Sequence, residues 1–265
     1  MTPLRSAVTA FLALGLSSCI TPPMAPADIL ADLAPTGKLR AAINFGNPVL
    51  ASKDAVTGEA RGVSVDLSRE LAKRLGVALE IVTYPAAGQV VEGLKGKSWD
   101  VAYLAIDPAR AVDIDYTAPY VVIEGAYLVR ADSPIRSNAE VDRAGVRVAV
   151  GKGSAYDLFL SRELKHATLE RAPTSPEVTD YFLAHKLDVA AGVKQQLEAD
   201  AKRVGSVRLL DGRFMVINQA MGTPKGRAAG AKYLRTFVEE MKASGFVAAA
   251  LARHGIEGAS VGPPE

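Results

Sequence analysis

The sequence is poor in the residues that build disulfides, metal centres and histidine-based catalytic sites. Its 265 residues include a single cysteine, Cys19, so an internal disulfide and a cluster of thiolate ligands are both excluded. The three histidines, His166, His185 and His254, fall outside the turns that carry motifs, and no Ser-His-Asp, Cys-His or metal-ligand spacing stands out. We therefore expect no metal and no cofactor.

An excess of charge of one sign is also lacking. Lysine and arginine total 31, aspartate and glutamate total 29, and the formal net charge is +2. This balance gives no reason to expect a nucleic acid or a strongly charged membrane surface as a partner. Hydrophobic residues make up 49% of the chain, which is enough for a sizeable core.

The N-terminal residues predict a targeting segment. The apolar run over 6–16 is too short to cross a bilayer as a helix. The text LSSC at 16–19 resembles a bacterial lipobox, so we expect a lipoprotein signal peptide over 1–18 and lipidation of Cys19. The alternative is an ordinary signal peptide that is cut elsewhere. The proline-rich residues 19–36 predict a tether.

From residue 37 onward, segments with strand patterns alternate with segments at helical spacing. The order strand, helix, strand, helix, strand predicts an α/β fold with a parallel sheet. Asp132-Ser133-Pro134 marks a boundary, and a second unit of the same kind begins with a strand at Val146. Residues 225–254 carry apolar residues at helical spacing and predict a final helical region.

The stretch from Trp99 to Tyr120 is the most informative part of the chain. An apolar segment over 100–106 predicts a buried strand, and Asp107-Pro108-Ala109-Arg110 predicts its end and the first turn of a short helix. Ligands of open α/β sheets usually bind at that edge, and a guanidinium there matches a carboxylate. The alternative is that Arg110 only pairs with Asp113 or Asp115 on the surface.

Three pieces of this stretch belong together: Pro108-Ala109-Arg110, Val112-Asp113, and the run over 115–120 that reads DYTAPY. Together they resemble the signature of the family 3 extracellular solute-binding proteins. That family comprises the periplasmic receptors of polar amino acid ABC importers. The resemblance implies that Arg110 holds the carboxylate of the ligand.

The resemblance also implies the architecture, a two-lobed periplasmic-binding-protein fold of type II. Lobe 1 would be discontinuous, comprising 37–130 plus 220–258, and lobe 2 would comprise 131–219. Two segments near 129–133 and 218–222 would cross between the lobes and absorb a hinge closure around the ligand.

The turn Gly151-Lys152-Gly153-Ser154 follows the first predicted strand of the second unit. Ser154 would present its hydroxyl and the free N–H groups of a helix start to an anion. As a simple helix cap it would need no ligand. In the family, the hydroxyl residue at this place touches the ligand carboxylate. The resemblance therefore implies a ligand contact for Ser154, and we also expect ligand contacts for Gly153 beside it and for Asn47 after the first strand.

The chain departs from the family pattern at positions that contact amino acids. Tyr103 and Ala105 replace small hydroxyl residues, Asp107 replaces the Ser or Thr before the proline, and Val193 replaces the aspartate that neutralises the α-ammonium. We therefore expect a carboxylate-bearing solute without a free amine, or an amino acid whose ammonium pairs with Asp107 or Glu124. The expected ligand contacts are Asn47, Tyr103, Ala105, Asp107, Arg110, Gly153, Ser154 and Val193.

These expectations describe a monomeric periplasmic binding protein, anchored by lipid at Cys19, that delivers an amino acid or related organic acid to an inner-membrane ABC permease. Two other functions stay open. A cyclohexadienyl dehydratase-like enzyme on the same fold would need a general acid, for which Asp107 and Glu124 are the candidates. A ligand-sensing partner of a signalling receptor would use the same cleft.

Overall fold

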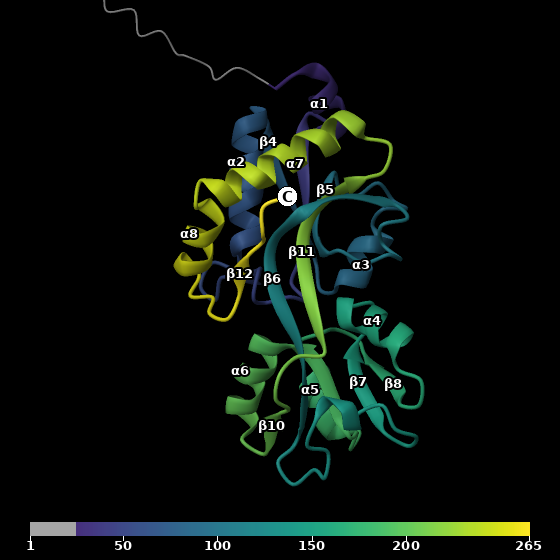
Figure 1. Ribbon diagram of the computed structural model, residues 1–265. Coiled ribbons are helices and arrows are strands. Elements are labelled where there is room, and N and C mark those ends of the chain that lie inside the picture. Colours follow the sequence, from purple (N-terminus) through teal and green to yellow (C-terminus); the bar gives the residue numbers. More distant parts are fainter. Residues whose placement is uncertain (1–24) are drawn as a thin grey trace, which may run out of the picture.

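Two long strands run through the molecule and connect its two lobes (Figure 1). They are β6 (Ile114–Arg130) and β11 (Met215–Pro224), which pair antiparallel from Met215 opposite Gly125 to Pro224 opposite Ile114. The computed structural model describes residues 25–265. The expected signal peptide and the expected lipidation site at Cys19 lie outside the described residues.

Lobe 1 is built on a parallel group of strands in the order β4, β1, β5, with β5 joined antiparallel to β11. All five residues of β5 are buried, as its continuous apolar text predicts. Helices cover this sheet, and α2 and α7 turn amphipathic faces toward the core. The elements of this lobe are α1 (Ala27–Leu33), β1 (Lys38–Asn44), β2 (Ser52–Lys53), β3 (Ala60–Arg61), α2 (Val63–Leu75), β4 (Ala78–Tyr84), α3 (Ala87–Glu92), β5 (Val101–Ala105), α7 (Ala228–Ala243), α8 (Phe246–Arg253) and β12 (Ser260–Val261).

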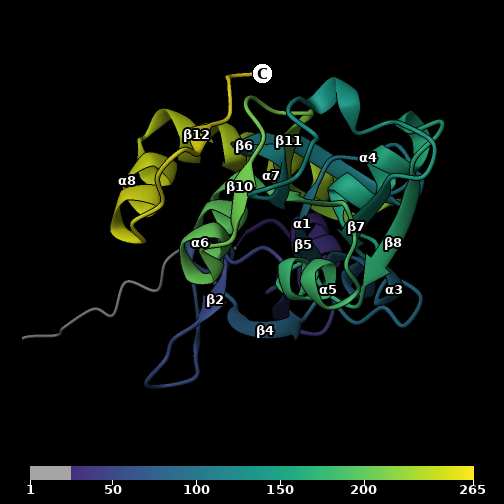
Figure 2. The same ribbon diagram turned by 90° about the horizontal axis from the view of Figure 1, so that it is seen from below.

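Lobe 2 repeats the arrangement at the other end of β6. Strands β8 and β9 flank β7 in parallel, and β9 pairs antiparallel with β6. Helices α4 and α5 pack on β7 and α6 packs on β9; Figure 2 shows them around the outside of the lobe. The elements are a 3₁₀ turn (Asn138–Glu140), β7 (Arg147–Gly151), α4 (Ala155–Glu163), β8 (Thr168–Ala172), α5 (Val178–Ala184), β9 (Val189–Val193), α6 (Lys194–Val204) and β10 (Val207–Leu209).

The first segment that crosses between the lobes lies earlier in the chain than the sequence predicts. Residues 125–128 of β6 pair with β9, and residues 128–130 pair with β10, so both groups lie within lobe 2. The expectation of a crossing at 129–133, and of a lobe boundary at residue 130, is therefore wrong. β6 runs through both lobes as one continuous strand, so no turn or loop in its sequence marks where the lobes meet.

The second crossing ends at a register shift. Residues 215–219 of β11 pair with β6, and from Gln219 onward the strand also pairs with β5 of lobe 1. The ladder with β6 is irregular between Gln219 and Ala220. Gln219 therefore stands where β11 enters lobe 1.

The tether expected over 19–36 is wrong for its second half, because residues 27–33 form α1. This helix packs against α7, and Arg227 Nη1 donates a hydrogen bond of 2.6 Å to the Asp32 carbonyl. Pro26 precedes the helix and Pro35 follows it. Prolines at those places are compatible with a helix between them.

Buried tyrosines make the fold sensitive to alkaline pH. Burial raises the pKa of Tyr116 and of Tyr156 to about 12, and it also raises the pKa of Tyr103, Tyr120 and Tyr127. Unfolded tyrosine ionises near pH 10. The stability contributed by keeping these phenols neutral is therefore fully present below about pH 10 and is lost as pH rises toward the folded-state pKa values.

We accordingly expect the melting temperature to fall steadily above about pH 10. Absorbance at 295 nm should show phenolate appearing in two steps, with the second step coinciding with loss of circular dichroism. Titration of all eight tyrosines near pH 10 in a protein that stays folded would contradict this.

Candidate functional site

Two consecutive turns follow β5, and Arg110 lies where the first ends and the second begins. The Arg110 and Ala111 amides both donate to the Asp107 carbonyl, at 3.1 and 2.9 Å, and the Ile114 amide donates to the Arg110 carbonyl at 3.1 Å. The short helix expected here is not formed, because β6 begins at Ile114 and the chain leaves the turns at that residue.

The Arg110 guanidinium is a buried cation that reaches from lobe 1 to lobe 2. Nη1 donates to the Ala105 carbonyl at 3.0 Å, and Nη2 donates to the Gly153 carbonyl of lobe 2 at 2.8 Å. Within residues 25–265, Nε has no hydrogen-bond partner and no carboxylate lies within ion-pair distance of Arg110. Its burial lowers its pKa. The alternative of a surface pair with Asp113 or Asp115 is therefore wrong.

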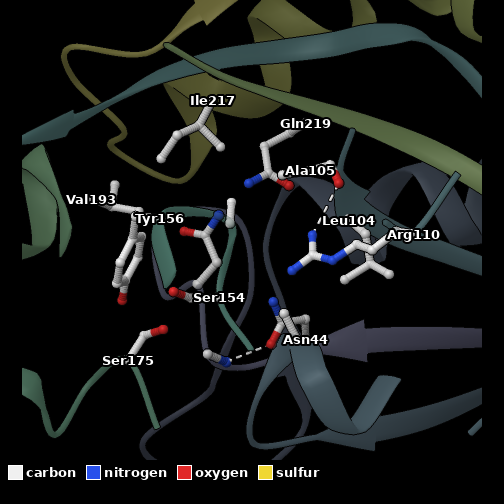
Figure 3. Close-up of a pocket in the computed structure, with 14 residues that line it drawn as sticks. Asn44, Leu104, Ala105, Arg110, Ser154, Tyr156, Ser175, Val193, Ile217 and Gln219 are labelled. Atoms are coloured by element: carbon white, nitrogen blue, oxygen red, sulfur yellow. Dashed lines mark hydrogen bonds between the residues drawn. The ribbon is translucent and has the colours of Figure 1, made fainter. Parts of the chain in front are cut away.

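Arg110 forms part of the wall of a cavity between the lobes (Figure 3). The cavity measures about 30 Å³, and its lining from both lobes combines three side-chain amides, three hydroxyls and several apolar groups. Among the described residues that line it, Arg110 is the only charged one. The lining residues are Asn44, Gly46, Asn47, Ala87, Leu104, Ala105, Arg110, Ser154, Ala155, Tyr156, Ser175, Val193, Ile217 and Gln219.

Ser154 is at once a helix cap and part of the cavity wall. Its Oγ accepts a hydrogen bond of 3.0 Å from the Asp157 amide at the start of α4. The Asp157 carboxylate accepts from the Gly153 amide at 2.8 Å and from Arg171 Nε at 3.0 Å. The negative charge of Asp157 is therefore already paired, and the Ser154 side chain lies at the cavity wall.

Asn47 brings an unsatisfied amide to the site. Its side chain is buried, and within the described residues neither Oδ1 nor Nδ2 has a hydrogen-bond partner. Its carbonyl accepts from the Leu50 and Ala51 amides at 3.1 Å each, which fixes the backbone beneath it. A buried amide left unpaired costs free energy, so this side chain is suited to bind a polar group of a solute.

Three expected ligand contacts, Tyr103, Asp107 and Gly153, do not line the cavity, and the Gly153 carbonyl instead accepts from Arg110 Nη2. Tyr103 points into the core of lobe 1, where its hydroxyl accepts from Ser68 Oγ at 2.9 Å and its ring meets Tyr120 edge-on. Neighbouring side chains of a strand point to opposite faces, and Leu104 is the one that lines the cavity. The expectation for Tyr103 is therefore wrong.

Asp107 does not line the cavity, and its carboxylate is instead bound by other groups of the protein. Its Oδ1 accepts from the Ala109 amide at 2.9 Å, and its Oδ2 accepts from Arg162 Nη2 of lobe 2 at 2.8 Å. Glu124 pairs with Arg213 at 2.7 Å and Lys194 at 3.4 Å, and the hydrogen bond from Arg213 is the main cause that lowers its pKa. Neither acid replaces the aspartate missing at Val193.

Nine lining residues were not anticipated from the sequence. Gln219 reaches the cavity from the register shift in β11, and the others come from strands, from turns and from the first residues of α3 and α4. Only the segment around Gln219 was indicated by the sequence, as an expected crossing. The nine are Asn44, Gly46, Ala87, Leu104, Ala155, Tyr156, Ser175, Ile217 and Gln219.

The Asp107–Arg162 pair joins the two lobes beside the cavity, so it should favour their closed arrangement. The Asp107 side chain is 4% exposed and that of Arg162 is 42% exposed. Pairs open to solvent contribute roughly 0.2–1 kcal/mol. Arg162→Met should therefore shift the equilibrium toward the open form by up to about fivefold and enlarge the radius of gyration in small-angle X-ray scattering.

Arg203→Met is a matched control for this variant, because Arg203 pairs with Asp180 and Asp200 inside lobe 2. An equal change in both variants, or no change in either, would mean that the interlobe pair does not govern closure.

The fold and the cavity together define a class of protein, one with two α/β lobes and a cavity between them. The chain belongs to the bacterial extracellular solute-binding proteins, family 3. The sequence model of that family matches residues 39–256. In the described residues no helix is long and apolar enough to span a bilayer, and no cluster of three histidine, cysteine or acidic residues is arranged to hold a metal.

Solved structures of similar fold are distant in sequence. A lysine-bound binding component of an ABC transporter from Wolinella succinogenes DSM 1740 is 23% identical with a TM-score of 0.71, and the match covers 82% of this chain and 95% of that one. A solute receptor for L-cysteine from Neisseria gonorrhoeae is 22% identical with a TM-score of 0.74, covering 85% and 92%. An ancestral amino acid-binding protein, described as a precursor of cyclohexadienyl dehydratase, is 22% identical with a TM-score of 0.72, covering 84% and 98%. At these identities the likeness establishes the fold.

Proposed function

We propose that this protein is the substrate-binding component of an ABC importer and captures a small carboxylate-bearing solute, an amino acid or a related organic acid, between its lobes. One observation carries the proposal. Arg110 is buried at the cavity, retains an unused Nε donor and has no carboxylate within ion-pair distance among the described residues. A buried cation without a counter-ion is costly, and a solute carboxylate would remove that cost.

The mechanism that follows is closure of the lobes on the solute. The carboxylate docks on Arg110 of lobe 1 while the cleft is open. Closure then brings the Ser154 hydroxyl and the start of α4 onto the same carboxylate, and the Asp107–Arg162 pair forms at the rim. The strands β6 and β11 connect the lobes and would absorb the rotation near residues 121–125 and 215–219. The closed form would be the one read by a permease in the inner membrane.

The expected location follows from this role. A substrate-binding component acts outside the cytoplasm, and lipidation of Cys19 would hold it at a membrane surface. A lipid anchor is part of the proposal, and labelling cells with a radioactive fatty acid would test it. Loss of the label in Cys19→Ser would support the anchor.

The dehydratase alternative gains no support from the cavity. A general acid must lie within reach of the leaving group. The described lining contains no carboxylic acid and no histidine, and Asp107 and Glu124 are both paired elsewhere. A sensing role with a signalling receptor would use the same solute site and would show the same binding behaviour.

A thermal-shift screen of residues 25–265 tests the proposal. The panel should hold amino acids, keto acids, hydroxy acids, aromatic acids, dicarboxylates and prephenate, with sugars and polyamines as non-carboxylate solutes. A ligand at 100 times its Kd stabilises a protein by about 2.7 kcal/mol, a shift of several degrees. Stabilisation by sugars or polyamines, with none by any carboxylate, would refute the proposed function.

A further inference from the structure

The charges of the residues that line the cavity restrict the chemical class of the solute more than the family of the protein does. Arg110 contributes one positive charge to the described lining, and no residue there contributes a negative charge. A monocarboxylate neutralises this site. A zwitterionic amino acid adds a second buried cation without a partner, and a dicarboxylate leaves one anion unpaired.

Acids outside the lining do not supply the missing charge. Three acids described above each have a cationic partner. Asp107 pairs with Arg162, Asp157 with Arg171, and Glu124 with Arg213. The position where an acid would face an ammonium holds Val193, whose side chain lines the cavity. None of these three acids therefore offers an unpaired carboxylate to an ammonium.

The amide of Asn47 adds a second requirement. It offers one acceptor and one donor group, both buried and both without partners in the described part of the chain. A hydroxyl can satisfy both, because it donates one hydrogen bond and accepts others. A carbonyl can only accept, and a methyl group can do neither.

We infer that the solute is a small hydroxy monocarboxylate, whose carboxylate binds Arg110 and whose hydroxyl hydrogen-bonds to the Asn47 amide. This inference rests on the proposed function. Asn47 is then the residue that selects a hydroxyl over an ammonium. This inference narrows the substrate class of the proposed site and leaves the role as a receptor unchanged.

Matched pairs that differ at one group test the inference. Calorimetric titration should compare lactate with alanine, 2-hydroxyisocaproate with leucine, and phenyllactate with phenylalanine, so that three sizes are covered. In at least one pair the hydroxy acid should bind tenfold or more tightly than its amino acid, and in no pair should the order reverse.

The variant Asn47→Leu removes the amide and keeps the volume. It should weaken the hydroxy acid about tenfold while leaving unchanged the affinity of the analogue that lacks the hydroxyl, such as propionate for lactate. The variant should melt no earlier than the wild type, because two unpaired buried atoms are lost. Gln89→Leu, at an exposed position of α3 outside the lining, is the control and should change neither affinity.

The outcomes separate this inference from the proposed function. Tighter binding of an amino acid in any pair, binding only of acids that lack a hydroxyl, or an equal loss for both analogues in Asn47→Leu would overturn the inference and keep the receptor role. Absence of binding by every carboxylate tested would overturn both.

Discussion

Replacing Arg110 with methionine is expected to weaken solute binding by about 30-fold or more. Truncating one partner of a buried, hydrogen-bonded charge pair costs roughly 2–5 kcal/mol, and each 1.4 kcal/mol is a factor of ten. The full effect is expected because Arg110 is the only charged residue in the described lining, so no neighbouring cation can take over the carboxylate.

The same change should leave the fold intact. Arg110 pairs with no carboxylate in the described chain, and its removal eliminates a buried charge at the loss of two hydrogen bonds to carbonyls. These effects oppose one another, so the melting temperature should move by less than a few degrees. Arg203→Met, outside the cavity, serves as the control and should bind solute normally. Wild-type affinity in Arg110→Met, measured by calorimetry, would remove Arg110 from the site.

The second large effect is expected from Val193→Asp. Val193 lines the cavity from lobe 2, and Figure 3 shows it on the opposite side of the cavity from Arg110. An aspartate there would supply the counter-charge that an α-ammonium lacks. Affinity for α-amino acids should rise at least tenfold, because a buried ion pair replaces an unpaired ammonium. Affinity for acids without an amine should fall.

Val193→Asn separates the charge from the change of shape. It has nearly the same volume as the aspartate and no charge, so it should show no gain for amino acids. Val193→Asp should also melt earlier than Val193→Asn when no solute is bound, because a carboxylate buried without a partner is costly. If both variants respond alike across a panel of amino acids, position 193 does not face the ammonium.

The turn after β5 shows what the sequence can reveal about this site. Asp107-Pro108 ended an apolar strand, and this local pattern was enough to place Arg110 at the edge of the sheet. Tyr103 was expected to contact the ligand and does not. The alternation of side chains along a strand predicts opposite faces for Tyr103 and Leu104. Closer use of that period would have assigned Leu104 to the cavity.

Other parts of the site depend on contacts that no local pattern contains. Gln219 reaches the cavity through an irregular pairing between β11 and β6, which are far apart in sequence. The unpaired amide of Asn47 follows from the absence of neighbours in three dimensions. The first crossing lies earlier than the sequence predicts, because β6 continues through the boundary as one strand and no turn marks it.

Recognition of the solute through its carboxylate is tested by comparing one carboxylic acid with its primary amide. The acid should be the best hit of the thermal-shift screen, and both compounds should be titrated into the wild-type protein by calorimetry. If Arg110 binds a carboxylate between the lobes, the uncharged amide should bind at least about 30-fold more weakly. Equal affinity for the acid and the amide would show that the solute is not recognised through its carboxylate, and the account of this site would fail.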